Sequence, residues 1–270
     1  MTDFEPKVVR TSTLGDFKRS RRKIAAITSY DHLTAGIFDR AGVDVLLVGD
    51  SAADNSLGYT STLPITVAEM IPFGRAVASA AKRALVVVDL PFGSYEVSPQ
   101  QALETGIDVM KKTGAAALKI EGGRRSSGQI EALVTAGIPV MGHIGFTPQS
   151  VHSLGGFKVQ GRGSAADELL AEAKAVEAAG AFAVVLELVP AEVAARVSEE
   201  LSIPTIGIGA GAATDGQILV WTDLAGLAGG KKRKFVRRYA NIAETLLTAV
   251  GQYVADVQNA DFPSEEESFE

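Results

Sequence analysis

The sequence predicts an α/β protein folded as a closed (β/α)8 TIM barrel of parallel strands. Short apolar runs of four to seven residues recur along the 270-residue chain, each followed by a polar or Gly-rich cluster. Continuous apolarity over this length is typical of strands buried on both faces. Helical patterns lie between many of the runs, and eight such units in about 250 residues match a barrel. A doubly wound open sheet also fits the alternation.

Seven strand candidates are clear from their Val, Ile and Ala content. They occupy residues 24–31, 43–51, 84–91, 115–123, 137–145, 181–190 and 203–211. An eighth candidate, near Asp223 to Leu227, is weaker. The sequence has no internal repeat, linker or break in composition, so we expect a single barrel domain over 1–270. Within it, residues 1–21 form a partly helical lead-in segment and residues 260–270 an acidic tail.

Capping signals predict where several helices begin. Pro99 suits the first position of a helix, Pro190 opens another, and Gly180 is a C-terminal stop. A terminal helix is expected over residues 234–254. The predicted cap pairs are Thr66 with Glu69, Ser98 with Gln101, and Ser164 with Asp167.

Charge and cysteine content exclude several classes of function. The chain has 26 basic and 32 acidic residues, a net charge of −6, and five of the acids lie in the last ten residues. Without these the balance is 26 against 27, so the body is near neutral and does not resemble a nucleic-acid-binding surface. The absence of cysteine excludes disulfides, thiolate zinc sites and a cysteine nucleophile.

The sequence also predicts a cytoplasmic protein with no membrane span. The N-terminus has no apolar signal-peptide core. Residues 132–157 lack charged side chains, but they contain two prolines and five glycines and make a poor membrane helix. The basic cluster KKRK at 231–234 is interpreted as a solvated face that opens the terminal helix.

Titratable groups end five different strand candidates. They are Asp50, Asp89, Glu121, His143 and Glu187. In a parallel barrel the carboxyl ends of all strands emerge on one face, where active sites lie. Polar loops alone explain one or two such residues, but they explain five less well because several lie inside the apolar run.

Three of these groups suit a magnesium ion. Asp50, Asp89 and Glu121 supply hard oxygen ligands from three adjacent strands, and Mg²⁺ accepts a few carboxylates and keeps other positions for water and substrate. Each acid could instead cap a helix or form a surface ion pair. A zinc site is not indicated, because the three histidines form no HExxH or HxH pattern.

The remaining polar residues suggest roles around a metal-bound anion. Lys119 and Glu121 point to the same side of their strand, so Lys119 either pairs with a buried acid or places a cation near substrate. The apolar run around Glu187 disfavours its charged form, which suits a base working near neutral pH. His143 alone is more often a core histidine.

The stretch GIGAGA at 207–212 formally matches a dinucleotide-binding fingerprint. It follows six strands, whereas such a unit usually begins a domain. We therefore interpret it as a Gly-rich loop that lets the backbone approach a ligand.

These residues lie in motifs that resemble the ketopantoate hydroxymethyltransferase family. The resemblance runs from Arg22 to Phe269, and its motifs are specific in this order. They include LLVGDS, STLPITVAEM, DLPFGSY, LKIEGG, GHIGFTPQS, GGFKVQGRG, LELVPAEVA and IPTIGIGAG. The resemblance implies a barrel of the phosphoenolpyruvate mutase/isocitrate lyase type, a bound Mg²⁺ ion and a homodecameric assembly.

The resemblance also implies the reaction. The family transfers a hydroxymethyl group from 5,10-methylenetetrahydrofolate to 3-methyl-2-oxobutanoate and forms 2-dehydropantoate (ketopantoate), on the route to pantothenate and coenzyme A. Glu187 matches its proton acceptor and His143 a histidine close to the substrate. The remaining matches are Asp50, Asp89 and Glu121 for Mg²⁺, and Asp50, Ser51, Asp89 and Lys119 for the 2-oxo acid.

Two alternatives differ in the chemistry they require. A metal-dependent C–C or C–P lyase could use the same barrel, although the isocitrate lyase version places a cysteine acid in its active loop and this chain has no cysteine. A non-catalytic metabolite-binding barrel would be marked by loss of Glu187 or of a metal carboxylate, and all of these are present.

Overall fold

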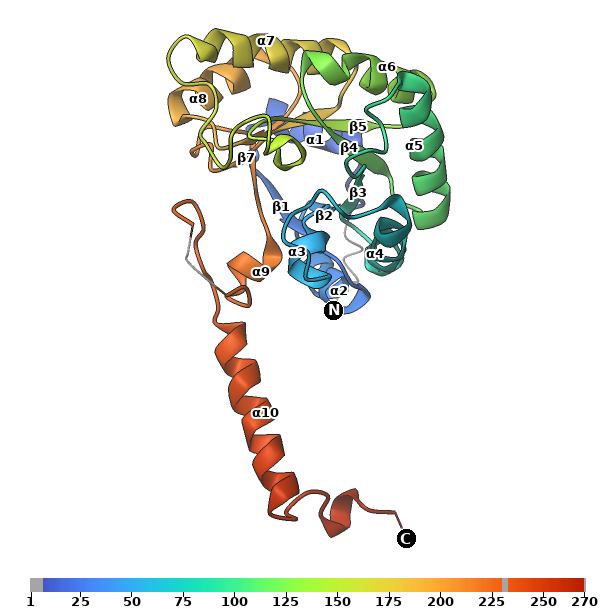
Figure 1. Ribbon diagram of the computed structural model, residues 1–270, viewed down its shortest axis with the longest axis vertical. Helices are drawn as coiled ribbons and strands as arrows, with labels where there is room; N and C mark the ends of the chain where they lie inside the picture. The colour runs from blue at the N-terminus through green and yellow to red at the C-terminus, as the bar shows by residue number, and fades with distance from the viewer. Residues whose placement is uncertain (1–6, 230–232, 270) are drawn as a thin grey trace. The chain divides into compact units, whose positions relative to one another are not determined.

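The computed structural model describes residues 7–229 and 233–269, and its central feature is a closed barrel of eight parallel strands in sequential order (Figure 1). Every strand pairs with its neighbours in the chain, and β1 closes the barrel against β8. The strands are β1 (Ile24–Thr28), β2 (Val45–Val48), β3 (Leu85–Asp89), β4 (Ala117–Glu121), β5 (Val140–Gly145), β6 (Ala183–Glu187), β7 (Thr205–Ile208) and β8 (Gly216–Leu219).

Helices connect most of the strands and form the outer layer (Figure 1). They are α1 (Thr11–Arg19), α2 (His32–Arg40), α3 (Ala52–Ser56), α4 (Val67–Ala80), α5 (Pro99–Thr113), α6 (Ser127–Thr135), α7 (Ala165–Ala178) and α8 (Ala191–Glu200). Short 3₁₀ turns lie at Arg124–Ser126 and Pro148–Ser150. The helix α1 confirms the expectation of a partly helical lead-in segment.

The strand interiors form the core. All residues of β2, β3, β4 and β6 are buried, which explains why their sequences are continuous apolar runs. Leu46 and Leu118 have no exposed surface. Burial of a leucine contributes roughly 1.5–3 kcal/mol, so these runs hold the barrel together.

The seven clear strand predictions are confirmed, but the position of the eighth is wrong. Strand β8 occupies Gly216–Leu219, and residues Trp221–Leu224 form the short helix α9. Only Ile218 and Leu219 of the strand are apolar, and Gln217 faces outward as an exposed side chain. Such a short strand has no apolar run to detect, and pairing with β1 and β7 creates it.

The capping predictions are confirmed for α4 and partly for α5. Thr66 and Glu69 form a complete capping box. Ser98 caps Gln101 as expected, although the Gln101 side chain accepts a hydrogen bond from the N–H of Val97 instead of Ser98.

For α7 only the C-terminal signal holds. Ser164 makes no capping hydrogen bond, because its backbone is already helical, and Asp167 pairs with Arg196 at 2.6 Å. Gly180 follows the helix with φ +93°, as a C-terminal stop requires. The stretch 207–212 runs from β7 into a loop in which Gly209 and Gly211 have positive φ.

Residues 221–270 form a second unit by their internal contacts, separate from the unit of residues 1–220. The terminal helix α10 spans Ile242–Gln258, so the prediction of helix from residue 234 is wrong for residues 234–241. The Tyr239 N–H donates a hydrogen bond to the Leu224 carbonyl, so this backbone group is not available to a helix at that position. Lys231 and Lys232 of the predicted basic cluster lie outside the described residues, as do residues 1–6 and 270.

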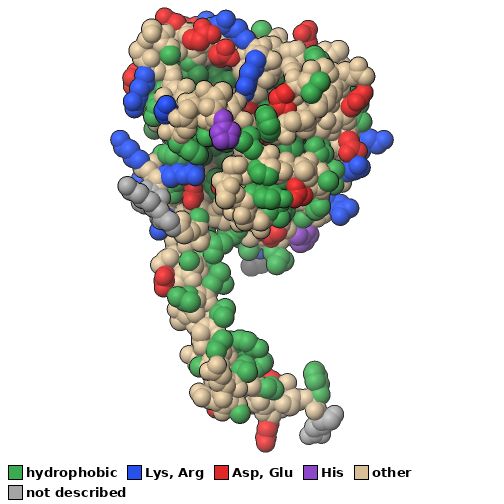
Figure 2. Space-filling view, in the orientation of Figure 1, with side chains coloured by type: hydrophobic (Ala, Val, Ile, Leu, Met, Phe, Trp, Pro, Cys, Tyr) green, Lys and Arg blue, Asp and Glu red, His purple; other side chains and the backbone are tan. Residues whose placement is uncertain are grey.

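The helix α10 has no buried residue, and hydrophobic side chains lie along it (Figure 2). The large exposed ones are Leu246, Leu247, Val250, Tyr253, Val254 and Val257. In the described part of the chain, no helix is long and apolar enough to cross a membrane.

Candidate active site

The five titratable groups predicted at strand ends all lie at the carboxyl end of the barrel. Asp89, Glu121 and Glu187 are the last residues of β3, β4 and β6, Asp50 lies two residues beyond β2, and His143 lies within β5. Their exposed fractions are only 1–8%. Such buried charge is costly unless it is paired, so each group needs a partner within the site.

The register of the strands creates the first of these pairs. Asp89 and Lys119 are directly aligned across β3 and β4, and the Lys119 Nζ lies 2.7 Å from Asp89 Oδ1. The other oxygen, Asp89 Oδ2, accepts a hydrogen bond from the Asp50 N–H at 3.0 Å. The predicted buried ion pair of Lys119 therefore exists, with Asp89 as the partner.

A second set forms one level further along the barrel. Glu121 aligns with His143 across β4 and β5, and Gly145 aligns with Glu187 across β5 and β6. The His143 Nδ1 lies 3.3 Å from Glu121 Oε1, and its Nε2 lies 3.3 Å from Glu187 Oε2. Gly145 has φ +87°, and a Cβ there would collide with the Glu187 carbonyl oxygen, so glycine is required beside this carboxylate.

Burial and crowding make two carboxyl groups hard to ionise. Burial raises the pKa of Asp50 well above its usual value, and the charges of Asp89 and Glu121 raise it further. Burial also raises the pKa of Asp89, although the Lys119 cation opposes the shift. The site thus holds more carboxyl groups than its own cations can keep ionised.

The pKa values of the neighbouring Glu121 and His143 shift in the directions that favour their charged forms. Burial alone would raise the pKa of Glu121, but the His143 ring and Lys119 hold it below its usual value. For His143, burial and Lys119 oppose protonation, yet the carboxylates of Glu121 and Glu187 raise its pKa to about 9. This shift favours the cationic form of His143, whose Nδ1 and Nε2 lie at ion-pair distance from the two carboxylates without hydrogen-bond geometry. The Lys119 Nζ, also 3.3 Å from Nδ1, does not donate to it in that state.

Two residues that sequence reasoning did not assign hold this site together. Gln149 donates from its Nε2 to Asp50 Oδ2 and from its backbone N–H to Glu121 Oε2, both at 2.9 Å. The Tyr95 hydroxyl donates to Gln149 Oε1 at 2.6 Å. The signal was present, because Gln149 lies in GFTPQS and Tyr95 ends DLPFGSY, but neither is at a strand end.

Ser51 lies beside the same carboxyl cluster. Its hydroxyl is 2.8 Å from the Tyr30 hydroxyl, which is buried, and burial raises the pKa of Tyr30. Tyr30 is therefore a neutral phenol that can orient the Ser51 hydroxyl.

The donor set fits Mg²⁺ through a pair of carboxylates. No three His, Cys, Asp or Glu side chains among residues 7–229 and 233–269 are grouped so as to hold a metal ion. Asp50 and Asp89 are neighbours with raised pKa values, and a bound divalent cation would favour the ionised form of both. Mg²⁺ commonly uses one or two carboxylates and completes its shell with other oxygens. Glu121 is turned toward His143 and the Gln149 N–H.

A closed parallel barrel with a buried acid–base cluster at its carboxyl ends defines the class of protein as a barrel enzyme. Solved structures place the fold among barrels of the phosphoenolpyruvate mutase/isocitrate lyase type. A phosphonopyruvate hydrolase, solved with oxalate and Mg²⁺, covers 96% of this chain and 93% of its own, with TM-score 0.60 and 14% identity. A 2,3-dimethylmalate lyase covers 97% and 92%, with TM-score 0.58 and 16% identity.

Sequence relatives define the family. Residues 8–265 match the ketopantoate hydroxymethyltransferase family. The 3-methyl-2-oxobutanoate hydroxymethyltransferase of Corynebacterium glutamicum is 58% identical over the full length of both chains, and that of Leifsonia xyli is 58% identical over 98% of this chain and 95% of its own. The chain belongs to the ketopantoate hydroxymethyltransferase family, whose members are transferases.

Proposed function

We propose that this enzyme transfers a hydroxymethyl group from 5,10-methylenetetrahydrofolate to 3-methyl-2-oxobutanoate, forming 2-dehydropantoate for pantothenate and coenzyme A synthesis. The observation that carries the proposal is the convergence of Asp50, Asp89, Lys119, His143 and Glu187 at one mouth of the barrel. The relatives at 58% identity support the same reaction by their names.

The acids have separate roles in this proposal. Asp50 and Asp89 would hold Mg²⁺ directly, and Glu121, whose carboxylate is turned toward His143 and the Gln149 N–H, stays the third predicted ligand. When bound, Mg²⁺ supplies Lewis-acid polarisation of the keto group of the 2-oxo acid. Ser51 and Asp89 contribute to binding of the same substrate.

Glu187 is the proposed base. It removes the proton from C3 of 3-methyl-2-oxobutanoate, and the resulting carbanion-like carbon attacks the one-carbon unit of the folate. With one water consumed, the products are 2-dehydropantoate and tetrahydrofolate. The cations of Lys119 and His143 stabilise the negative charge that develops on the substrate oxygen and on the neighbouring carboxylates.

The proposal includes a homo-oligomer in the cytoplasm, with a homodecamer implied by family resemblance. The apolar face of α10 supports an assembly, because such a face normally packs against another surface. The cytoplasmic location stays a prediction from the sequence.

The reaction is tested by direct product analysis. Purified enzyme is given 3-methyl-2-oxobutanoate with Mg²⁺ and 5,10-methylenetetrahydrofolate, and 2-dehydropantoate is measured by mass spectrometry. We expect product only when all components are present, and loss of product when EDTA removes the metal.

The alternatives give different results in the same assay. A lyase would cleave a 2-hydroxy acid without folate, and a metabolite-binding barrel would bind the 2-oxo acid without turnover. Either result would overturn the proposed transfer.

A further inference from the structure

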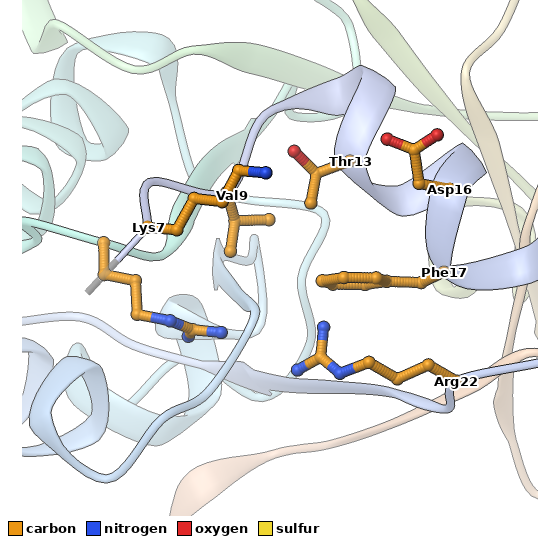
Figure 3. A pocket seen from close by; sticks show the side chains of 7 residues that line it. Lys7, Val9, Thr13, Asp16, Phe17 and Arg22 are labelled. Atoms are coloured by element: carbon orange, nitrogen blue, oxygen red, sulfur yellow. The ribbon is translucent and has the colours of Figure 1, made fainter. Parts of the chain in front are cut away.

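A cavity of about 360 Å³ is lined by residues that precede strands β1 and β3, which places it at the opposite end of the barrel from the site described above. Figure 3 shows this cavity from close by. Its walls include Arg22, which precedes β1, and Arg83, which precedes β3. The helix α1 covers it with Thr13 and Phe17. A volume of this size is within the range of small-molecule sites.

A buried carboxylate positions the two arginines. The Nη2 atoms of Arg22 and Arg83 lie 2.8 and 2.7 Å from the same oxygen, Asp44 Oδ1. Asp44 is only 1% exposed, and its other oxygen accepts the Ala25 N–H at 3.1 Å. Because Asp44 is held between strands, both guanidinium groups are oriented before any ligand arrives.

The cavity carries uncompensated positive charge. The lining holds three cations, Lys7, Arg22 and Arg83, and one acid, Asp16, whose carboxylate is paired with Arg19. The buried Asp44 carboxylate serves both Arg22 and Arg83. Among the residues for which side chains are described, none forms an ion pair with Lys7.

Part of the cavity wall is apolar. The Arg22 guanidinium lies 3.6 Å from the centroid of the Phe17 ring, and Val9 is buried beside it. Figure 3 shows Phe17, Arg22 and Val9 around the open centre, with the Thr13 hydroxyl on the rim. That hydroxyl accepts the Arg10 N–H at 3.0 Å, so its own proton remains available to a ligand.

We propose that this cavity is a second binding site, which takes a small organic anion. A carboxylate or phosphate group faces Lys7 and the free N–H edge of Arg22, since guanidinium groups match both oxyanions. The apolar part of the ligand packs on Val9 and Phe17.

The two sites are too far apart to share one small ligand. Asp44 lies six residues before Asp50 on the same strand path, which corresponds to roughly 15–20 Å. An anion in the cavity therefore binds without displacing a 2-oxo acid from the carboxyl end of the barrel.

The test measures binding of two probes by calorimetry, phenyl phosphate and benzoate, in the presence of saturating 3-methyl-2-oxobutanoate and Mg²⁺. We expect saturable binding of at least one probe at one site per chain, and the stronger probe identifies the oxyanion. Lys7→Met weakens that binding about tenfold, as loss of one charge-assisted hydrogen bond implies. Arg22→Lys keeps the charge and also weakens binding, because the planar group is lost.

The matched control is Lys111→Met, an exposed lysine on α5, which leaves binding unchanged. Circular dichroism checks that each variant is folded. Absence of saturable binding by both probes overturns the proposal, as does equal weakening in Lys7→Met and Lys111→Met. Probe binding that is seen without 3-methyl-2-oxobutanoate and lost when it is saturating would assign the binding to the other end of the barrel and also overturns the proposal, without affecting the proposed reaction.

Discussion

At the scale of single residues, the candidate site is a balance of buried charges. The pKa of Lys119 is raised. Burial alone would lower this pKa, but the charges of Asp89, Glu121 and Asp50 outweigh the effect of burial. Sequence reasoning identified Lys119 and the acids from their position at apolar strand ends. It left open whether Lys119 pairs with an acid, because that depends on which strand lies beside it.

Glu187→Gln tests the proposed base. The variant should fold and bind 3-methyl-2-oxobutanoate, but lose exchange of the C3 proton by roughly 10²–10⁴-fold, since an amide cannot accept that proton. The measurement is deuterium incorporation at C3 by NMR without folate. Glu192→Gln, an exposed acid on α8, is the control. Near-normal exchange in Glu187→Gln would remove Glu187 from the mechanism.

Lys119→Met tests the buried ion pair. Removing the cation leaves the Asp89 carboxyl group buried without its partner, at a cost of up to about 3–5 kcal/mol in the free energy of unfolding. Adding Asp89→Asn should recover part of this loss, because the uncompensated charge is then removed. Urea unfolding in metal-free buffer measures both. A double variant no more stable than Lys119→Met would argue against this coupling.

At the scale of elements, the starts of α4 and α5 were predicted correctly where a side-chain cap forms, and the start of α10, where none forms, was wrong; the short strand β8 was also misplaced. The box of Thr66 and Glu69 involves residues three apart, so the sequence contains both partners. The start of α10 at Ile242 has no side-chain cap, and β8 has no apolar run, so neither carries a local signal.

Glu69→Gln tests the capping box through its pH dependence. The Tyr59 hydroxyl and Thr66 hold the pKa of Glu69 below its ordinary value near 4.5. A carboxyl group whose pKa is lower in the folded than in the unfolded protein stabilises the folded state at pH values above the unfolded-state pKa. This contribution is lost as the pH falls through the folded-state pKa. The melting temperature of Glu69→Gln should therefore be below wild type at pH 7, with a gap that narrows in acid.

The control for this comparison is Glu131→Gln, an exposed acid within α6, away from the start of the helix. Its melting temperature should follow wild type at every pH. A constant gap for Glu69→Gln from pH 7 into acid would mean that the Glu69 charge does not stabilise the helix.

At the scale of the whole molecule, α10 presents an apolar stripe that its own unit leaves exposed. Leu246, Val250, Tyr253, Val254 and Val257 follow the spacing of one helical face. A stripe of this kind indicates a packing partner, in agreement with the proposed homo-oligomer.

Replacing Leu246 and Val250 together by Glu should break that assembly, because two buried charges at an interface are costly. Sedimentation velocity should then show a smaller species than the wild type. Thr248→Glu lies on the polar face of the same helix and should leave the assembly intact. An unchanged sedimentation coefficient in the double variant would exclude α10 from the interface.

The sequence by itself determined the alternation of strands and helices, the chemistry-bearing residues and their common face. These follow from apolar periodicity and from the rule that parallel strands end together. Only the tertiary structure decided the pairs, Lys119 with Asp89 and His143 with Glu121, and brought Gln149 to Asp50. The physical reason is that these contacts join residues far apart in the chain, and the register between strands, which no local pattern encodes, sets their distances.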